Sequence, residues 1–347
     1  MITYLVVGRN DYYGINLHKR TAVSLNFFGS LCEGEDDEII YVDCNTPEHE
    51  LTLAEAISDT LTPETRRRLR IFRVSGEQMH AAIGETPLPF SDELSRNVGI
   101  RRSNPRNPWL LSTNCDILLY PLAGASMHQI LARLPLRFHL CPRGNIPAPQ
   151  WQELDRTDVS AAAGLCEAVI CSGMRPPPEK PQEWLRFSAV GDFQLAPRDQ
   201  WLAIGGCEEG MKLWGHSDAN NTLRLNLLNG GGRTPDVADH LRVLHLDHNF
   251  TVRSAHEHVL PNNDWKFWIE DTVRPESRNP ETWGLRDVDL PEIRLRADTS
   301  LSAQEILSKH RRERNFLRDL RTRLLAGIWQ KIGALANRVE ARLRQKR

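Results

Sequence analysis

Three short apolar segments near the N-terminus constrain the fold of this chain more than any other feature. Ile2–Val7, Glu38–Cys44 and Arg70–Val74 are rich in β-branched and aromatic residues, as buried strands are. The segments between them have helical character, with apolar residues at roughly helical spacing across Leu17–Leu31 and further helical stretches at 52–61 and 63–69. Thr62 is a suitable N-cap for the last of these, with Pro63 at its first position. Strands and helices in alternation are typical of a parallel sheet with crossover helices. We therefore predict an α/β fold with a mixed, mostly parallel sheet flanked by helices.

Polar residues follow several of the predicted strands at the point where each strand ends. Asp11 lies past the first strand, and Asp43 lies at the end of the second. Asp116 lies in Trp109–Leu119, whose sequence WLLSTNCDILL places a polar break between two apolar strands. Because ligands collect at the carboxyl ends of parallel strands, we expect these three carboxylates on one rim. Asp116, with Asn114 beside it, offers oxygen ligands to Mg²⁺ or Mn²⁺; an aspartate in a tight turn is the alternative.

A helix is predicted over Ser91–Arg102, where the first serine is a suitable N-cap and acidic residues occupy the first turn. It carries Arg96, Arg101 and Arg102 next to the loop that precedes WLLSTNCDILL. Arginines in this place either form a solvated helix face or meet phosphate oxygens, which their planar fork suits. Both interpretations stay open.

The C-terminal half contains a second group of candidate residues. A helix predicted over Ala219–Leu228 follows Asp218, and an aspartate in that place is suited to cap it. A strand predicted over Leu241–Leu246 delivers His245 and His248. Because residues three apart in a strand point to opposite faces, we expect only one of these histidines to bind a given ion.

Four motifs occur in a recognisable order along the chain. They are the strand that ends at Asp43, the run Asn97-x-Gly99-x-Arg101, WLLSTNCDILL, and GDFQLAPRDQWLAIGGCEEG followed by GHSDANNTLRL. Together they resemble GT-A fold glycosyltransferases of the family 2 type, over Ile2–Asn249. The resemblance implies a Rossmann-like GT-A sheet. It also implies an inverting transfer of a sugar from a nucleotide-diphosphate donor, such as a UDP-sugar, to a hydroxyl of a glycan or lipid-linked acceptor.

The resemblance also implies a role for each matched residue. On the donor side it implies Asp43 at the nucleotide base, Asn97 and Arg101 near the diphosphate or sugar, Asn114 at the ribose, Asp116 at the metal, and Arg9 among the donor contacts. His245, or else His248, would complete a Mn²⁺ or Mg²⁺ site. On the acceptor side it implies Glu209 and Trp214, with Asp218 as the catalytic base. Two positions depart from the family pattern: Asn114 replaces the first carboxylate of D-x-D, and Ser217 replaces the glutamate before Asp218.

The chemistry of sugar transfer explains why such residues are needed. A divalent cation stabilises the departing diphosphate without a proton, and a carboxylate accepts the proton of the attacking hydroxyl. Two other function classes stay open. A nucleotidyltransferase also uses such a sheet, although Gly8-Arg9-Asn10-Asp11 is a poor match to the basic glycine-rich loop expected there. A non-catalytic sugar-nucleotide-binding or scaffold protein is suggested by the two departures.

The charge distribution divides the chain. Lys309–Arg347 carries 13 Lys or Arg against 3 Asp or Glu, a net of +10, so the remainder carries −11. Apolar residues recur at three- to four-residue spacing from Leu317 to Leu343. This pattern predicts a basic amphipathic helical tail that binds an anionic membrane surface, a partner helix or, nonspecifically, nucleic acid; of these we favour the membrane and expect no nucleic-acid partner. We divide the chain into a nucleotide-sugar-binding half (1–122), an acceptor-binding half with a loop-rich extension (123–300) and the tail (301–347).

No secretory signal or membrane span is recognisable in the sequence, and the seven cysteines include no CxxC pair. We therefore expect a cytoplasmic protein with reduced thiols, peripheral at the membrane if the tail binds there. A transferase of polysaccharide biosynthesis would suit that location.

Overall fold

The computed structural model describes residues 1–11, 13–14, 16–173, 190–213, 215–232, 234–248, 267 and 273–295. The predicted basic tail 301–347 and the candidate residue Trp214 lie outside these residues. Within them, no helix is both long enough and apolar enough to cross a lipid bilayer. None of the seven cysteines forms a disulfide in the described part of the chain.

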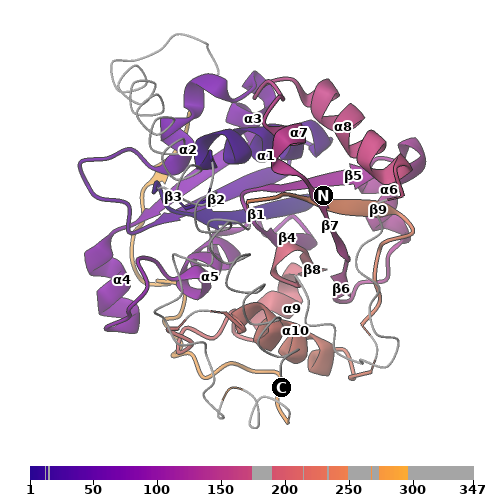
Figure 1. Cartoon of the computed structure of the whole chain (residues 1–347). Helices are drawn as coiled ribbons and strands as arrows, with labels where there is room; N and C mark the ends of the chain where they lie inside the picture. The colour runs from indigo at the N-terminus through magenta and orange to yellow at the C-terminus, as the bar shows by residue number, and fades with distance from the viewer. Residues whose placement is uncertain are drawn as a thin grey trace, which may run out of the picture.

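In the described part of the chain, a seven-stranded mixed sheet forms the centre of the fold (Figure 1), with strand order β10-β3-β2-β1-β4-β8-β6. The run from β3 to β4 is parallel, whereas β10, β8 and β6 pair antiparallel at the two edges. The predicted mixed α/β sheet is therefore confirmed, and its parallel part is central. The strands are β1 (Ile2–Gly8), β2 (Glu38–Cys44), β3 (Leu69–Val74), β4 (Trp109–Thr113), β6 (His139–Leu140), β8 (Gln194–Pro197) and β10 (Glu292–Ile293).

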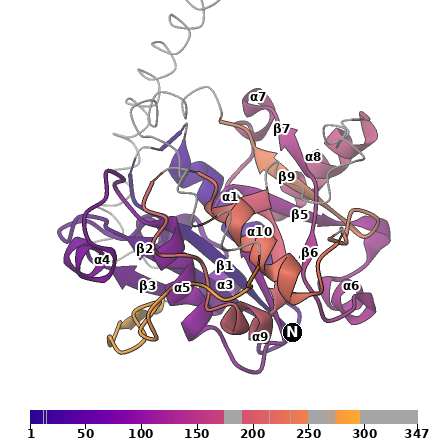
Figure 2. The same cartoon turned by 90° about the horizontal axis from the view of Figure 1, so that it is seen from below.

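Helices cover both faces of this sheet, as Figure 1 shows from the side and Figure 2 from below. The upper face in Figure 1 carries α1 (Leu17–Leu31), α2 (Leu53–Ala56) and α3 (Pro63–Arg68); α7 (Ala148–Trp151) and α8 (Val159–Cys171) lie on the same side, where α8 packs against α1. The lower face carries α4 (Gly76–Ile83), α5 (Asp92–Arg102), α9 (Arg198–Ala203) and α10 (Ser217–Leu228). The remaining elements are α6 (Met127–Arg133) and the 3-10 turns η1 (Ser58–Thr60), η2 (Leu122–Gly124) and η3 (Val190–Asp192).

The side chains of β1 alternate between two apolar cores, because successive residues of a strand point to opposite faces. Tyr4 packs against Phe28 of α1 on one side, with ring centroids 5.3 Å apart. Leu5 belongs to the core on the α5 side. Gly99 lets α5 approach the sheet closely, since a Cβ at this position would lie 2.1 Å from Leu5 Cδ1. Burial on both faces explains why β1 and β2 have nearly continuous apolar sequences.

A second, three-stranded sheet with order β5-β9-β7 continues from the first within the described residues. The chain leaves β4, turns through 114–116 and enters β5 (Ile117–Pro121), which pairs antiparallel with β9 (Leu241–Leu246). β9 also pairs in parallel with β7 (Arg143–Ile146). In this register Ile117 lies opposite His245, so two candidates far apart in sequence, Asp116 and His245, are brought together.

Two predicted N-caps are confirmed. The Thr62 side chain accepts a hydrogen bond from Thr65 N at the start of α3, and the Ser91 side chain accepts one from Leu94 N at the start of α5. The segment 161–171, whose sequence is compatible with either a helix or a strand, belongs to α8.

Two predicted helix boundaries are wrong. The stretch 52–61 is not one helix, because α2 ends at Ala56 and a 3-10 turn follows. α10 begins at Ser217, with His216 at its N-cap in the left-handed conformation (φ 69°) and no side-chain cap. Asp218 therefore lies in the first turn, and the alternative that it is the N-cap is contradicted.

Candidate active site

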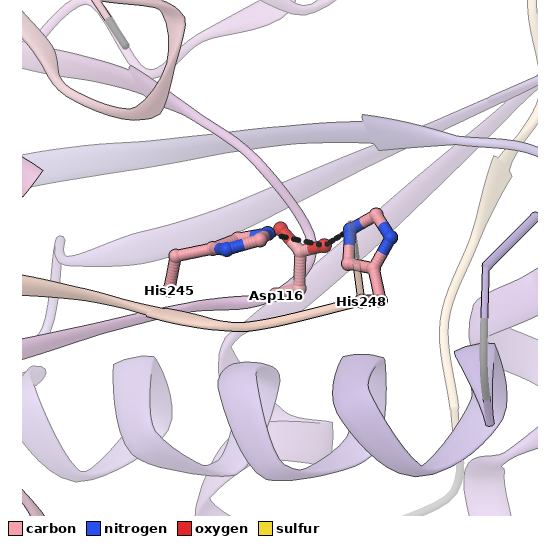
Figure 3. Close-up of side chains that lie close together, drawn as sticks. All are labelled: Asp116, His245 and His248. Carbon is pink, nitrogen blue, oxygen red and sulfur yellow. Dashed lines mark ion pairs between the residues drawn. The ribbon is translucent and has the colours of Figure 1, made fainter. Parts of the chain in front are cut away.

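Asp116, His245 and His248 meet at the junction between the two sheets (Figure 3). Asp116 ends the turn after β4, and its carbonyl accepts a hydrogen bond of 3.0 Å from Leu246 N. The Asp116 Oδ2 atom lies 3.5 Å from His245 Nε2 and 2.9 Å from His248 Nε2. All three side chains are buried. We call these residues the Asp-His-His triad.

The expectation that His245 and His248 point to opposite faces is wrong, because both face Asp116 Oδ2. It assumed that both residues belong to one strand, in which positions three apart face opposite ways. β9 ends at Leu246, so His248 is free of that alternation and turns back toward the same carboxylate. The two imidazole rings lie 4.9 Å apart.

The electrostatics of the triad favour a charged carboxylate. Burial alone would raise the pKa of Asp116, yet the charge of His245, hydrogen bonds from both histidines and the charge of Arg20 hold it well below its ordinary value. Burial, together with the charge of Arg20, lowers the pKa of His248. An ionised carboxylate and a neutral imidazole are the forms in which these side chains ligate metals.

The Asp-His-His triad fits a divalent cation. Each residue offers one ligand atom, and these atoms all lie within 4.8 Å of one another. One carboxylate oxygen and two imidazole nitrogens form a donor set that suits first-row transition metals. Bound there, a cation would supply positive charge to an anionic ligand.

Arg20 also joins this site, and sequence reasoning missed it. The arginine lies on α1, its side chain is fully buried, and its Nη1 forms an ion pair with Asp116 Oδ2. Its Nη2 donates a hydrogen bond of 2.7 Å to the carbonyl of Tyr13. The only available signal was a charged residue within the apolar pattern of 17–31, which does not reveal a partner 96 positions away.

Asp43 and Asp11 lie on the same rim, as predicted. Burial raises the pKa of Tyr41 well above its ordinary value, and the charges of Asp43, Asp11 and Asp116 raise it further. Asp43 is fully buried at the end of β2, and burial raises its pKa to about 7. Its Oδ2 accepts a hydrogen bond of 2.8 Å from Leu53 N, whereas its Oδ1 has no partner among the described residues.

Arg9 is the first residue after β1, at the same edge of the sheet. Its Nε donates a hydrogen bond of 2.9 Å to the carbonyl of Asn45, the residue after β2. The side chain thereby bridges the ends of two neighbouring parallel strands.

Asn114 belongs to a polar network beside the triad. Its Oδ1 accepts a hydrogen bond of 2.7 Å from Arg96 Nη2, and its Nδ2 donates one of 2.7 Å to Asp192 Oδ1. Asp192 also pairs with Arg143 at 2.8 Å. Arg96 forms a further ion pair with Asp92 at 2.6 Å. Among the three arginines predicted to face this loop, the structure therefore brings Arg96 to the turn; Asp192 and Arg143 were not predicted.

Asp218 lies next to this network. Its Oδ2 accepts a hydrogen bond of 3.1 Å from Gly191 N, and its Oδ1 accepts one of 2.8 Å from Ala219 N. Burial raises the pKa of Asp218, and the nearby charges of Asp192 and Asp92 add to the effect. Residues 190–192 thus connect Asp218 to the Asn114 amide.

The three remaining candidates lie elsewhere in the fold. The Asn97 amide donates to Cys207 O and Glu209 Oε1 and accepts from Cys207 N. Glu209 Oε1 also accepts a hydrogen bond of 2.8 Å from Gly284 N. Arg101 stacks 3.7 Å from the centroid of the Trp283 ring. These side chains fasten the 279–284 loop to α5 and the GGCEEG segment, rather than converging on the triad.

No protein-family model matches this sequence, and no curated protein does. Several solved structures are similar to it in overall chain path. They include S. aureus TarS 1–349 (TM-score 0.41, 11% identity, 73% of this chain and 63% of that chain). GalNAc-T7 with UDP, GalNAc and Mn²⁺ is another (TM-score 0.44, 14% identity, 72% and 43%), as is the galactosyltransferase LgtC with donor and acceptor sugar analogs (TM-score 0.36, 13% identity, 70% and 86%). The chain spans less than two thirds of TarS 1–349 and of GalNAc-T7, and none of these likenesses assigns it an activity.

Proposed function

We propose that this chain is a GT-A type, inverting glycosyltransferase that moves a sugar from a nucleotide-diphosphate donor, such as a UDP-sugar, to a hydroxyl of a glycan or lipid-linked acceptor. One observation carries the proposal: a buried Asp-His-His triad lies at the carboxyl ends of parallel strands, on the same rim as the buried Asp43. Ligands collect at this edge in open α/β sheets.

On the donor side, Asp116, His245 and His248 would hold a divalent cation against the diphosphate. We propose Mn²⁺ over Mg²⁺, because Mg²⁺ prefers oxygen ligands in octahedral geometry and two of the three protein ligands here are imidazole nitrogens. The Asp43 Oδ1 atom would accept a hydrogen bond from the nucleotide base. Asn114 would contact the ribose, and Arg9 the donor between the strand ends.

On the acceptor side, Asp218 would be the catalytic base. Burial raises its pKa, and a carboxylate with a raised pKa is a better acceptor for the proton of the attacking hydroxyl. The hydrogen bond from Gly191 N fixes one carboxylate oxygen in place. One-step displacement by that hydroxyl would invert the anomeric configuration. Glu209 would act by holding the acceptor-side loop, with Trp214 as a further contact.

Asn97 and Arg101 would support this site rather than touch the donor. Their hydrogen bonds and stacking hold the 207–209 segment and the 281–284 loop against α5. We propose Arg96 as the arginine of α5 that orients the donor, through its bond to Asn114.

A thermal-shift screen of nucleotide sugars with Mn²⁺, Mg²⁺ or EDTA tests the donor assignment. We expect stabilisation by a nucleoside diphosphate or its sugar that is larger with Mn²⁺ than with Mg²⁺. Asp218→Asn should keep donor binding while transfer falls by about 10²-fold or more, the usual effect of losing a general base. Asp199→Asn is the matched control and should retain both, because Asp199 also lies in the first turn of a helix, α9, but is exposed. No stabilisation by any nucleoside diphosphate would refute the proposal.

The second candidate function is a non-catalytic sugar-nucleotide-binding protein. Asn114 stands where a second carboxylate would add charge to the metal site, and Arg20 already pairs with Asp116. Under this alternative, Asp218→Asn would leave every measurable property of nucleotide binding unchanged, and the wild-type protein would transfer no sugar.

A further inference from the structure

Three positively polarised groups converge on one oxygen of Asp116. Its Oδ2 atom forms the ion pair with Arg20 Nη1 and also faces the Nε2 atoms of His245 and His248 at 3.5 and 2.9 Å. The guanidinium comes from α1, on a different element from either histidine. The carboxylate charge is therefore already balanced by the protein itself.

A divalent cation cannot simply be added to this arrangement. The guanidinium of arginine keeps its charge at every accessible pH, so Arg20 cannot reduce its repulsion of a bound cation by losing a proton. A cation bound to Asp116 Oδ2 would lie within a few ångströms of that charge, in a buried site where repulsion is weakly screened. Either the ion or Arg20 can pair closely with the oxygen, but not both.

Arg20 also contacts the loop that follows β1. Its Nη2 donates to the carbonyl of Tyr13 at 2.7 Å. The next residue, Gly14, has a φ of +72°, and a Cβ there would lie 2.5 Å from Arg20 Nη2 and 2.7 Å from His248 Nδ1. The loop is therefore packed directly against both the arginine and one triad histidine, so a shift of Arg20 must disturb it.

We propose that Arg20 is a positioning residue that acts as a built-in counter-cation for Asp116 and competes with the metal. With no metal bound, it pairs with the carboxylate that both histidines face. When a divalent cation binds, the ion pair between Arg20 and Asp116 Oδ2 breaks. The contact of Arg20 with the Tyr13–Gly14 loop then changes as well. The inference deepens the proposed function and rests on its metal site.

Direct Mn²⁺ binding, measured by electron paramagnetic resonance or calorimetry without nucleotide, tests the competition. Arg20→Met should bind Mn²⁺ at least about tenfold more tightly than wild type, because the competing charge is gone. Arg20→Lys, which keeps the charge, should stay near wild type. Arg224→Met is the matched control, since Arg224 is equally buried but bonds to the Ile204 and Gly206 carbonyls; its Mn²⁺ affinity should not change.

Adding His248→Ala to Arg20→Met should abolish the gain, which places the ion at the triad. Unchanged or weaker Mn²⁺ binding by a folded Arg20→Met protein would overturn the competition. If that variant does not fold, hydrogen exchange of the wild-type protein decides: saturating Mn²⁺ should speed amide exchange in residues 13–20, and unchanged or slower exchange would overturn the inference. If the proposed function is wrong, nucleoside diphosphates will not stabilise the protein in the thermal-shift screen, while Arg20→Met will still bind Mn²⁺ more tightly than wild type.

Discussion

The buried ion pair between Arg20 and Asp116 should be a major determinant of stability. Arg20 is fully buried and Asp116 is 5% exposed, so neither charge is well hydrated. Asp116→Asn removes the negative charge and leaves the guanidinium buried against a neutral amide. Removing one partner of a buried pair costs about 3–5 kcal/mol. The unfolding entropy of about 2.1 cal/mol/K per residue grows with chain length, so for a chain of 347 residues we expect the melting temperature to fall by roughly 4–7 °C.

The pH dependence gives this prediction a second, independent signature. The folded pKa of Asp116 is held below its ordinary value by the histidines and Arg20, against the effect of burial. A carboxylate with a lowered folded pKa contributes stability above the unfolded pKa, about 3.9, and loses it as the pH falls through the folded value. The difference between wild type and Asp116→Asn should therefore be full at pH 7 and shrink below about pH 4.

Urea unfolding followed by tryptophan fluorescence measures both effects. A double-mutant cycle with Arg20→Met isolates the pair, and the two changes together should cost clearly less than the sum of their separate costs. A loss below about 1 kcal/mol at pH 7, the range of an exposed pair, would refute the reasoning. Strict additivity in the cycle would also contradict it.

Three further predictions use other parts of the molecule. Asp43→Asn should raise the free energy of unfolding at pH 8 and much less at pH 4. Burial raises the folded pKa of Asp43 to about 7, so ionising this carboxylate costs stability as the pH rises from its unfolded pKa, about 3.9, to the folded value. An equal gain at pH 8 and pH 4 would contradict this. Gly99→Ala should cost about 1–3 kcal/mol in urea unfolding by overpacking against Leu5. Gly164→Ala in α8, where a Cβ meets nothing within 4 Å, is its control and should stabilise by about 0.5–1 kcal/mol; equal effects would refute the packing argument. Truncation at Leu301 should abolish sedimentation with anionic vesicles, and unchanged sedimentation would exclude the tail as the membrane-binding segment.

Local patterns predicted the frame of the site well. The apolar runs of β1 and β2 identified buried parallel strands, and the topology of such strands places Asp43 and Asp116 at one edge whatever the details. The caps of α3 and α5 also followed from single residues, because capping depends only on the next turn of chain.

Contacts between distant segments could not be predicted. His248 reaches Asp116 because β9 stops at Leu246, and strand ends are set by pairing partners rather than by local propensity. Asn97 and Arg101 match a motif, yet their side chains bond to residues around 207 and 283. A spacing along one helix does not reveal which loop will fold over it.

The order of synthesis gives the Arg20–Asp116 pair one more consequence. Both residues precede β5, whereas the two histidines come from the end of β9, much later in the chain. On a ribosome, the nascent carboxylate can therefore be neutralised by the guanidinium long before either imidazole emerges. The segment up to β5 can therefore bury the Asp116 carboxylate before β9, the strand that pairs with β5, has been synthesised. A fragment that ends before β9 should keep α1 protected from limited proteolysis, and should lose that protection with Arg20→Met.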